Sequence, residues 1–182
     1  MFEGTDMKLE MAYYFLSNIK RLADDVGGIA YVRSGKRNEL EANLDGFFFE
    51  LISAKDFFLQ GINDNYVNLA KEKATKLNLL KSSLAAGKNT KALKVVESIE
   101  KELSDKTSWL WRLNNYRNSA THRELLGIGY VASTNLDHVE AHLFEDPEDS
   151  GKGNMQLEVI PYCEQSLKAM SDFLEELYSK LS

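Results

Sequence analysis

The sequence predicts a mainly α-helical protein: an antiparallel four-helix-type bundle with one extra helix and a small β insertion before the last helix. Four segments repeat apolar residues at the three- and four-residue spacing that lines one face of a helix. Between residues 127 and 160 the pattern changes to that of short strands. The chain contains only two prolines, so long helices can form without interruption. Four long amphipathic segments of this kind are typical of an antiparallel bundle.

The first two predicted helices each carry an apolar stripe. The first stripe consists of Leu9, Ala12, Leu16, Ile19, Ala23 and Val26. The second stripe consists of Leu40, Leu44, Phe47, Leu51, Ala54 and Phe58. The first helix should stop at Gly27-Gly28, and the second follows the basic stretch from Arg33 to Arg37. We expect both stripes to face the core.

The remaining predicted helices differ in character. The stretch from Tyr66 to Leu84 is rich in lysine and has a thin apolar stripe, so we expect an exposed extra helix there. The third core helix follows the turn-like stretch from Ala86 to Asn89, with a stripe of Val96, Ile99, Leu103, Leu110 and Leu113. The last helix begins near Pro161, a favourable residue for a first turn. Its stripe consists of Cys163, Leu167, Met170, Leu174, Leu177 and Leu181.

The β-rich insertion is expected at about residues 128–160. Its predicted strands are 129–132, 139–144 and 157–160, and they flank an acidic, glycine-containing loop from Glu145 to Gly153. No internal repeat and no long linker divides the chain. We therefore predict a single helical domain over residues 1–182.

The composition of the chain argues against a membrane protein, a secreted protein and a protein that binds nucleic acid over its whole surface. No apolar run approaches the roughly 20 residues of a membrane span, and the N-terminus lacks the pattern of a signal peptide. A single cysteine, Cys163, excludes an intramolecular disulfide and suits a reducing compartment, so we expect a cytoplasmic protein without a membrane partner. The formal net charge is −6, whereas proteins that grip nucleic acid over their whole surface are usually basic. Any contact with nucleic acid should be local or built from two subunits.

One short run combines residues with phosphate chemistry: Arg117-Asn118-Ser119-Ala120-Thr121-His122. Arginine binds phosphate through a planar fork and keeps its charge. Histidine gains or loses a proton near neutral pH. An arginine and a histidine together can cleave a phosphodiester without a metal ion. We therefore predict no cofactor and no metal site.

The position of Arg117 adds to this interpretation. Stepping along the third stripe in threes and fours passes through Lys106, Leu110 and Leu113 and reaches Arg117, where packing alone would favour an apolar residue. His122 lies about 140° further around an ideal helix, so the two side chains can share a site only if the helix bends, ends or borders a groove. The alternative is a structural arginine that pairs with a buried carboxylate such as Asp45 or Glu50.

The run from Arg117 to His122 resembles the R-x(4–6)-H motif of the HEPN superfamily, in the form where a polar residue directly follows the arginine. HEPN domains are also similar to this chain in their helical-bundle architecture. The resemblance implies that Arg117 holds the scissile phosphate and that His122 is the general acid or base. It implies that Asn118 orients one of these two side chains or the phosphate. It implies metal-independent endoribonuclease activity with 2′,3′-cyclic phosphate and 5′-hydroxyl products. It further implies a homodimer, and a toxin or defence role with an antitoxin partner.

Other interpretations remain open. The chain could be a non-catalytic HEPN-like module that binds a nucleotide or a protein, or a purely structural helical scaffold. His138 and His142 are four residues apart, but in a strand or turn they are more typical of surface histidines than of a metal site. Trp109 and Trp111 could stack bases, although only one can share the buried side of the helix. Cys163 is interpreted as a packing residue.

Overall fold

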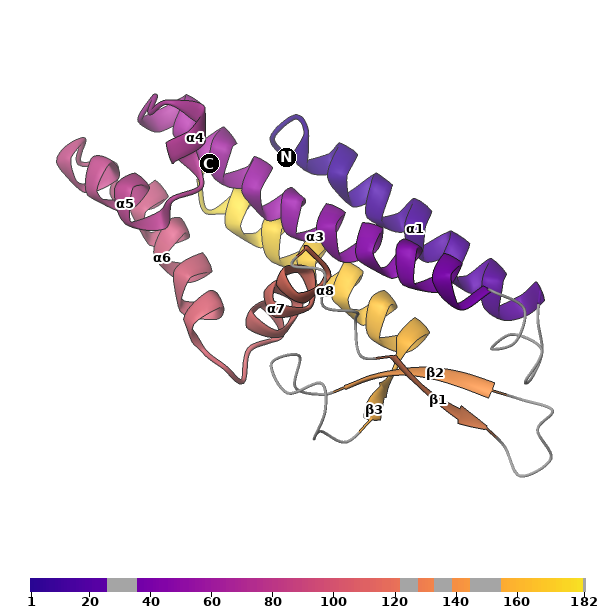
Figure 1. The fold of residues 1–182 in the computed structure, drawn as a ribbon. Coiled ribbons are helices and arrows are strands. Elements are labelled where there is room, and N and C mark those ends of the chain that lie inside the picture. The colour runs from indigo at the N-terminus through magenta and orange to yellow at the C-terminus, as the bar shows by residue number, and fades with distance from the viewer. Residues whose placement is uncertain (26–35, 122–127, 133–138, 145–154, 182) are drawn as a thin grey trace.

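Residues 1–25, 36–121, 128–132, 139–144 and 155–181 are described by the computed structural model of the chain. Three long helices form the body of the protein: α1 (Thr5–Asp25), α3 (Lys36–Tyr66) and α8 (Val159–Ser179) (Figure 1). The other elements are two short helices, α4 (Lys71–Ala74) and α5 (Leu77–Ala86), then α6 (Thr90–Ser104) and α7 (Trp109–Thr121), and three strands. The predicted mainly helical fold with a small sheet before the last helix is confirmed.

Helix α1 runs antiparallel to α3 and packs closely along it. Lys8 of α1 pairs with Glu50 of α3 at 2.7 Å, and Phe15 lies over Gly46. A Cβ atom at Gly46 would come within 2.5 Å of the Phe15 ring, so glycine is required there for the close approach of the two helices. The predicted stripes are confirmed at Leu16 and Ile19 on α1, which are buried together with the whole predicted stripe of α3.

Helix α8 completes the long-helix layer. It runs antiparallel to α1, with Lys20 paired to Glu164 near one end and Phe2 edge-on to Tyr178 near the other. The predicted third strand reached residue 160, but β3 ends at Glu158 and the helix begins at Val159. Pro161 is the third residue of α8, where the missing backbone N–H removes no helical hydrogen bond.

The single extra helix predicted between Tyr66 and Leu84 is wrong in detail. Helix α3 continues to Tyr66, and α4 and α5 follow as two separate helices. The buried side chain of Asn63 closes the turn after α3 by binding both backbone groups of Leu69, at 2.8 and 3.0 Å. Asn68 takes a φ of 66°, a left-handed conformation that asparagine tolerates better than most residues. These local hydrogen bonds compete with continuation of the helix.

The third core helix is also divided, into α6 and α7, with a break at residues 105–108. Asp105 Oδ1 accepts hydrogen bonds from the backbone N–H and the hydroxyl of Thr107, at 2.9 and 2.7 Å. These bonds lower the pKa of the Asp105 carboxyl. Ser108 Oγ accepts a hydrogen bond from the Leu110 N–H at 3.1 Å and so caps the start of α7. Lys106 therefore lies in an exposed turn, and the predicted stripe through it is not continuous.

The three strands form one antiparallel sheet in the order β1 (Ile128–Ala132), β2 (Val139–Phe144) and β3 (Met155–Glu158). Ile128 of β1 and Leu143 of β2 are register partners, and both are buried in the same hydrophobic core as the helices. In Figure 1 the sheet lies at one end of the protein and α5 and α6 at the other. Within the described residues, no helix is both long and apolar enough to cross a membrane.

Candidate functional site

Helix α7 carries the described part of the predicted motif and is held by one buried face. Leu110, Leu113 and Tyr116 are buried on that face. The Tyr116 ring stacks on Phe48 of α3 at a centroid distance of 5.2 Å and meets Tyr162 of α8 edge-on at 5.6 Å. Aromatic contacts with two long helices therefore fix the position of the turn that contains Arg117.

Arg117 lies seven residues after Leu110, on the same side of α7. Its side chain is half-buried and its Nε atom is fully enclosed. The guanidinium carbon lies 5.8 Å from the centroid of the Phe49 ring on α3, and Nη1 donates a hydrogen bond to Asn118 Oδ1 at 3.3 Å. The spacing thus correctly placed this arginine on the buried side of its helix. An arginine in this setting keeps its charge while water is partly excluded, which strengthens its attraction for an anion.

The histidine of the motif, His122, lies outside the described residues, and so does Gly127. Helix α7 is described as far as Thr121, the residue directly before His122. Arg117 and Asn118 are therefore brought together, while the distance from Arg117 to His122 stays a prediction. Of the basic residues that flank the motif, Arg112 is half-buried on α7 and Arg123 is outside the described residues.

The carboxylates considered as structural partners of Arg117 have different surroundings. Glu50 pairs with Lys8 of α1. Burial, followed by repulsion from Glu41, raises the pKa of the Asp45 carboxyl above its ordinary value. The two causes of this shift are burial and Glu41, and neither involves an arginine.

The remaining candidates are placed as follows. Trp109 packs edge-on against Phe173 of α8 at 5.8 Å, whereas Trp111 has the Lys106 ammonium 5.5 Å from its ring centroid. Cys163 is fully buried, and burial raises the pKa of its thiol, which agrees with a packing role.

The histidine pair and the acidic loop were the candidates for metal binding. His142 is a buried residue of β2, opposite Glu158 of β3. Its predicted companion His138 and the loop from Glu145 to Gly153 lie outside the described residues. Among the described residues, no group of three histidine, cysteine or carboxylate side chains is arranged to hold a metal ion.

The sequence interpretation missed the role of Phe49. Three consecutive phenylalanines, Phe47 to Phe49, are separated by about 100° each on a helix, so they cannot all face one core. Phe47 and Phe48 are buried, and Phe49 is 43% exposed beside Arg117. The run itself was the signal that one ring had to lie elsewhere.

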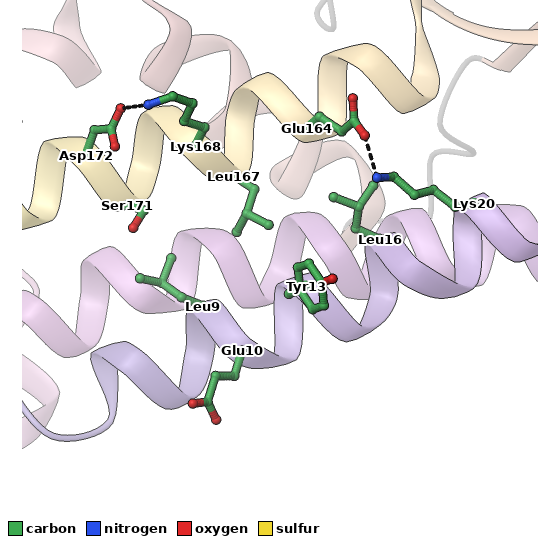
Figure 2. Close-up of a pocket in the computed structure, with 10 residues that line it drawn as sticks. All are labelled: Leu9, Glu10, Tyr13, Leu16, Lys20, Glu164, Leu167, Lys168, Ser171 and Asp172. Atoms are coloured by element: carbon green, nitrogen blue, oxygen red, sulfur yellow. Dashed lines mark hydrogen bonds and ion pairs between the residues drawn. The ribbon is translucent and has the colours of Figure 1, made fainter.

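A separate groove of about 560 Å³ runs between α1 and α8, away from Arg117 (Figure 2). Leu9, Leu16 and Leu167 form its apolar lining. Ion pairs of Lys20 with Glu164 and of Lys168 with Asp172 lie along its edge. Its mixed charges and open shape give no reason to assign it to phosphate chemistry.

Comparison of this chain with known proteins identified no related protein. The sequence matches no protein-family model, and neither a curated protein nor a solved structure is significantly similar to it.

Proposed function

We propose that this protein is a metal-independent endoribonuclease of the HEPN type, in which Arg117 binds the scissile phosphate. The observation that carries the proposal is the half-buried guanidinium of Arg117, held between Phe49 and the side-chain oxygen of Asn118. A preorganised cation in a partly dehydrated site stabilises the charge that develops on phosphate in the transition state. Asn118 supports this arrangement as a positioning residue, because its amide oxygen binds Arg117 Nη1.

In the proposed mechanism His122 transfers the protons. As a general base it removes the proton of the ribose 2′-hydroxyl, whose oxygen attacks the adjacent phosphorus. The bond from phosphorus to the 5′-oxygen breaks, and that oxygen is protonated. The products are a 2′,3′-cyclic phosphate and a 5′-hydroxyl. No water is consumed in this step, and the chemistry requires no metal ion.

The homodimer belongs to the same proposal and is supported by the exposed surface of α1. Met7, Met11, Tyr13 and Tyr14 are between 40% and 63% exposed on this one helix. Exposed apolar side chains gathered in this way are typical of a protein contact. Met7, Tyr14 and Arg21 are seven residues apart and share one exposed side of α1, and Arg21 also approaches Glu39 of α3 at 3.8 Å. A two-fold axis between two antiparallel α1 helices would bring the exposed apolar side chains of the two copies together.

This α1 surface borders the candidate site. The Lys8 ammonium lies 5.9 Å from the centroid of the Phe49 ring, the same ring that Arg117 approaches. A second copy on α1 therefore lies close to the site. A toxin or defence role in the cytoplasm, with an antitoxin partner, completes the proposal and rests on the motif alone.

The alternative is a non-catalytic module that binds a nucleotide or a protein. The acidic net charge of −6 favours it, since weak attraction for long RNA limits turnover. A small nucleotide would need only the local charge of Arg117.

Cleavage of RNA in the presence of EDTA tests the proposal. We expect wild type to cleave several unstructured RNAs, and Arg117→Ala and His122→Ala to lose at least about 100-fold in rate, the scale of general acid–base and electrostatic contributions. Arg37→Ala is the matched control, because Arg37 is an exposed arginine paired with Glu41 on α3. Equal cleavage by all four proteins would indicate a contaminating nuclease, and no cleavage by wild type would favour the binding module.

A further inference from the structure

The acidic chain contains one strongly basic segment. From Lys71 to Lys94 there are seven lysines and a single acidic residue, Glu72. The rest of the chain carries 15 basic and 27 acidic residues, so the positive charge is concentrated in about an eighth of the sequence. This segment comprises α4, α5 and the start of α6, which we call the basic arm.

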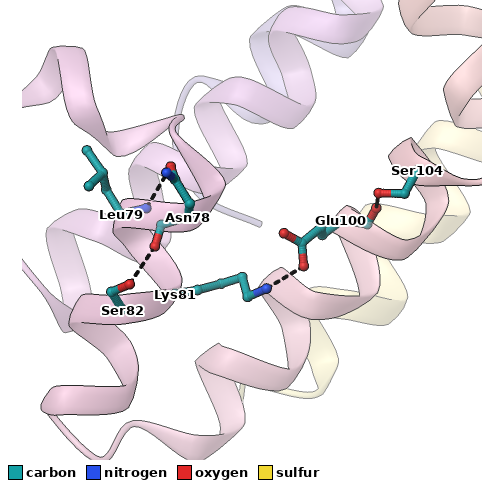
Figure 3. A network of polar contacts seen from close by, with 6 residues as sticks. All are labelled: Asn78, Leu79, Lys81, Ser82, Glu100 and Ser104. Carbon is teal, nitrogen blue, oxygen red and sulfur yellow. Dashed lines mark hydrogen bonds and ion pairs between the residues drawn. The ribbon is translucent and has the colours of Figure 1, made fainter.

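The basic arm presents most of its lysines to solvent. Lys71, Lys73, Lys76, Lys88 and Lys94 are exposed, and none of them forms an ion pair with another described residue. Lys81 is different: it pairs with Glu100 and ties α5 to α6 (Figure 3). The lysines lie at both ends of α5, which is about 15 Å long.

The arm is rigidly placed relative to the candidate site. Leu80 and Leu84 of α5 and Val96 and Ile99 of α6 are buried in the hydrophobic core. From the arm, helix α6 extends for up to about 22 Å and leads through residues 105–108 into α7, where Arg117 lies eight residues, or about 12 Å, beyond the helix start. A polyanion several nucleotides long is therefore needed to contact the arm and the site at once.

We propose that the basic arm binds the phosphate backbone of RNA and delivers the strand to the site at Arg117. Lysines act as point charges toward phosphate, and binding of this kind is independent of sequence. That the bound polyanion is RNA rests on the proposed function. The position of the basic arm and its positive charge do not depend on that proposal. A localised basic surface also explains how a protein of net charge −6 engages RNA.

The test compares two triple variants of the full chain in an Arg117→Ala background, which prevents cleavage. The arm variant is Lys73→Gln/Lys88→Gln/Lys94→Gln. The control is Lys20→Gln/Lys168→Gln/Lys180→Gln, whose lysines lie on α1 and α8 and after α8. Both remove three positive charges, and glutamine retains a good helix propensity. Binding of fluorescent single-stranded RNA is measured from 50 to 300 mM salt, with circular dichroism melting curves to compare folding.

We expect the arm variant to bind about tenfold more weakly or worse, with a salt slope reduced by about 2, and the control to bind like its parent. Equal loss in both variants, or binding of polyglutamate but not of RNA, would overturn the proposal. The two proposals can fail separately. If the arm binds RNA but the wild-type protein does not cleave it, only the proposed nuclease activity is refuted. If the wild-type protein cleaves RNA but the arm variant binds RNA as tightly as its parent, only the role of the basic arm is refuted.

Discussion

The guanidinium of Arg117 and the ring of Phe49 face each other across the contact between α3 and α7, 5.8 Å from guanidinium carbon to ring centroid. A cation beside an aromatic face gains about 0.5–1 kcal/mol at exposed sites and more where water is excluded. Phe49 thus helps to hold the half-buried side chain of Arg117 on α7. The relationship connects the packing of two core helices to the proposed phosphate site.

Replacing Phe49 tests whether this contact positions Arg117. We expect Phe49→Leu to lower the rate of RNA cleavage by about 2–5-fold, the equivalent of 0.5–1 kcal/mol, with little change in melting temperature because Phe49 is 43% exposed. The matched control is Phe57→Leu, a half-buried phenylalanine two turns further along α3 that has the Lys8 ammonium 5.6 Å from its ring centroid. A rate in Phe49→Leu equal to that of the control would show that the ring does not position the arginine.

Asn118 offers a second test of the same geometry. Its amide oxygen accepts a hydrogen bond from Arg117 Nη1 at 3.3 Å. A carboxylate in its place would bind the guanidinium more strongly and repel phosphate, so we expect Asn118→Asp to lose more cleavage activity than Asn118→Ala. Single-turnover rates on one RNA measure both variants. The reverse order would mean that the side chain acts on the substrate in some other way.

The exposed face of α1 should control oligomeric state. Light scattering after size exclusion should give a dimer for wild type and a monomer for Met7→Glu/Tyr14→Glu, because these changes add charge to an apolar contact. Leu79→Glu is the control, since Leu79 is 38% exposed on α5. A monomeric wild-type protein at high micromolar concentration would contradict the proposed dimer.

Asp45 predicts a pH-dependent stability. Burial and Glu41 raise the pKa of its carboxyl in the folded protein, so the folded state binds the proton more tightly than the unfolded state. At pH values above the raised pKa of the folded state, the ionised Asp45 carboxylate therefore lowers the free energy of unfolding. This loss of stability disappears at pH values below the pKa of the unfolded state, about 4. We expect Asp45→Asn to melt at a higher temperature than wild type at pH 7 and at nearly the same temperature at pH 3.5. A lower melting temperature at pH 7 would indicate a stabilising partner for this carboxylate.

The helices were predictable because their apolar residues repeat with the helical period. The buried stripe of α3, from Leu40 to Phe58, follows the predicted pattern at every position. The boundaries that were missed depend on polar side chains that bind backbone groups nearby. Asn63 ends α3, and Asp105 with Ser108 separates α6 from α7. Such hydrogen bonds produce no repeating pattern of residues from which a helix boundary could be predicted.

The candidate site was predictable only in part. Arg117 could be placed on the buried side of its helix because it follows Leu110 by seven residues and both lie on the unbroken helix α7. The contact with Phe49 could not be predicted, since it joins residues 68 positions apart through the packing of two helices. The pairing of Arg117 with His122 remains a prediction that chemistry must test.

The ends of the cleaved RNA test the central claim most directly. Mass spectrometry of an oligonucleotide cut by the wild-type protein in EDTA should find 2′,3′-cyclic phosphate on one fragment and a 5′-hydroxyl on the other. These ends should be absent when Arg117→Ala is used. Fragments that carry 5′-phosphate ends, or cleavage that requires a divalent metal ion, would contradict the account.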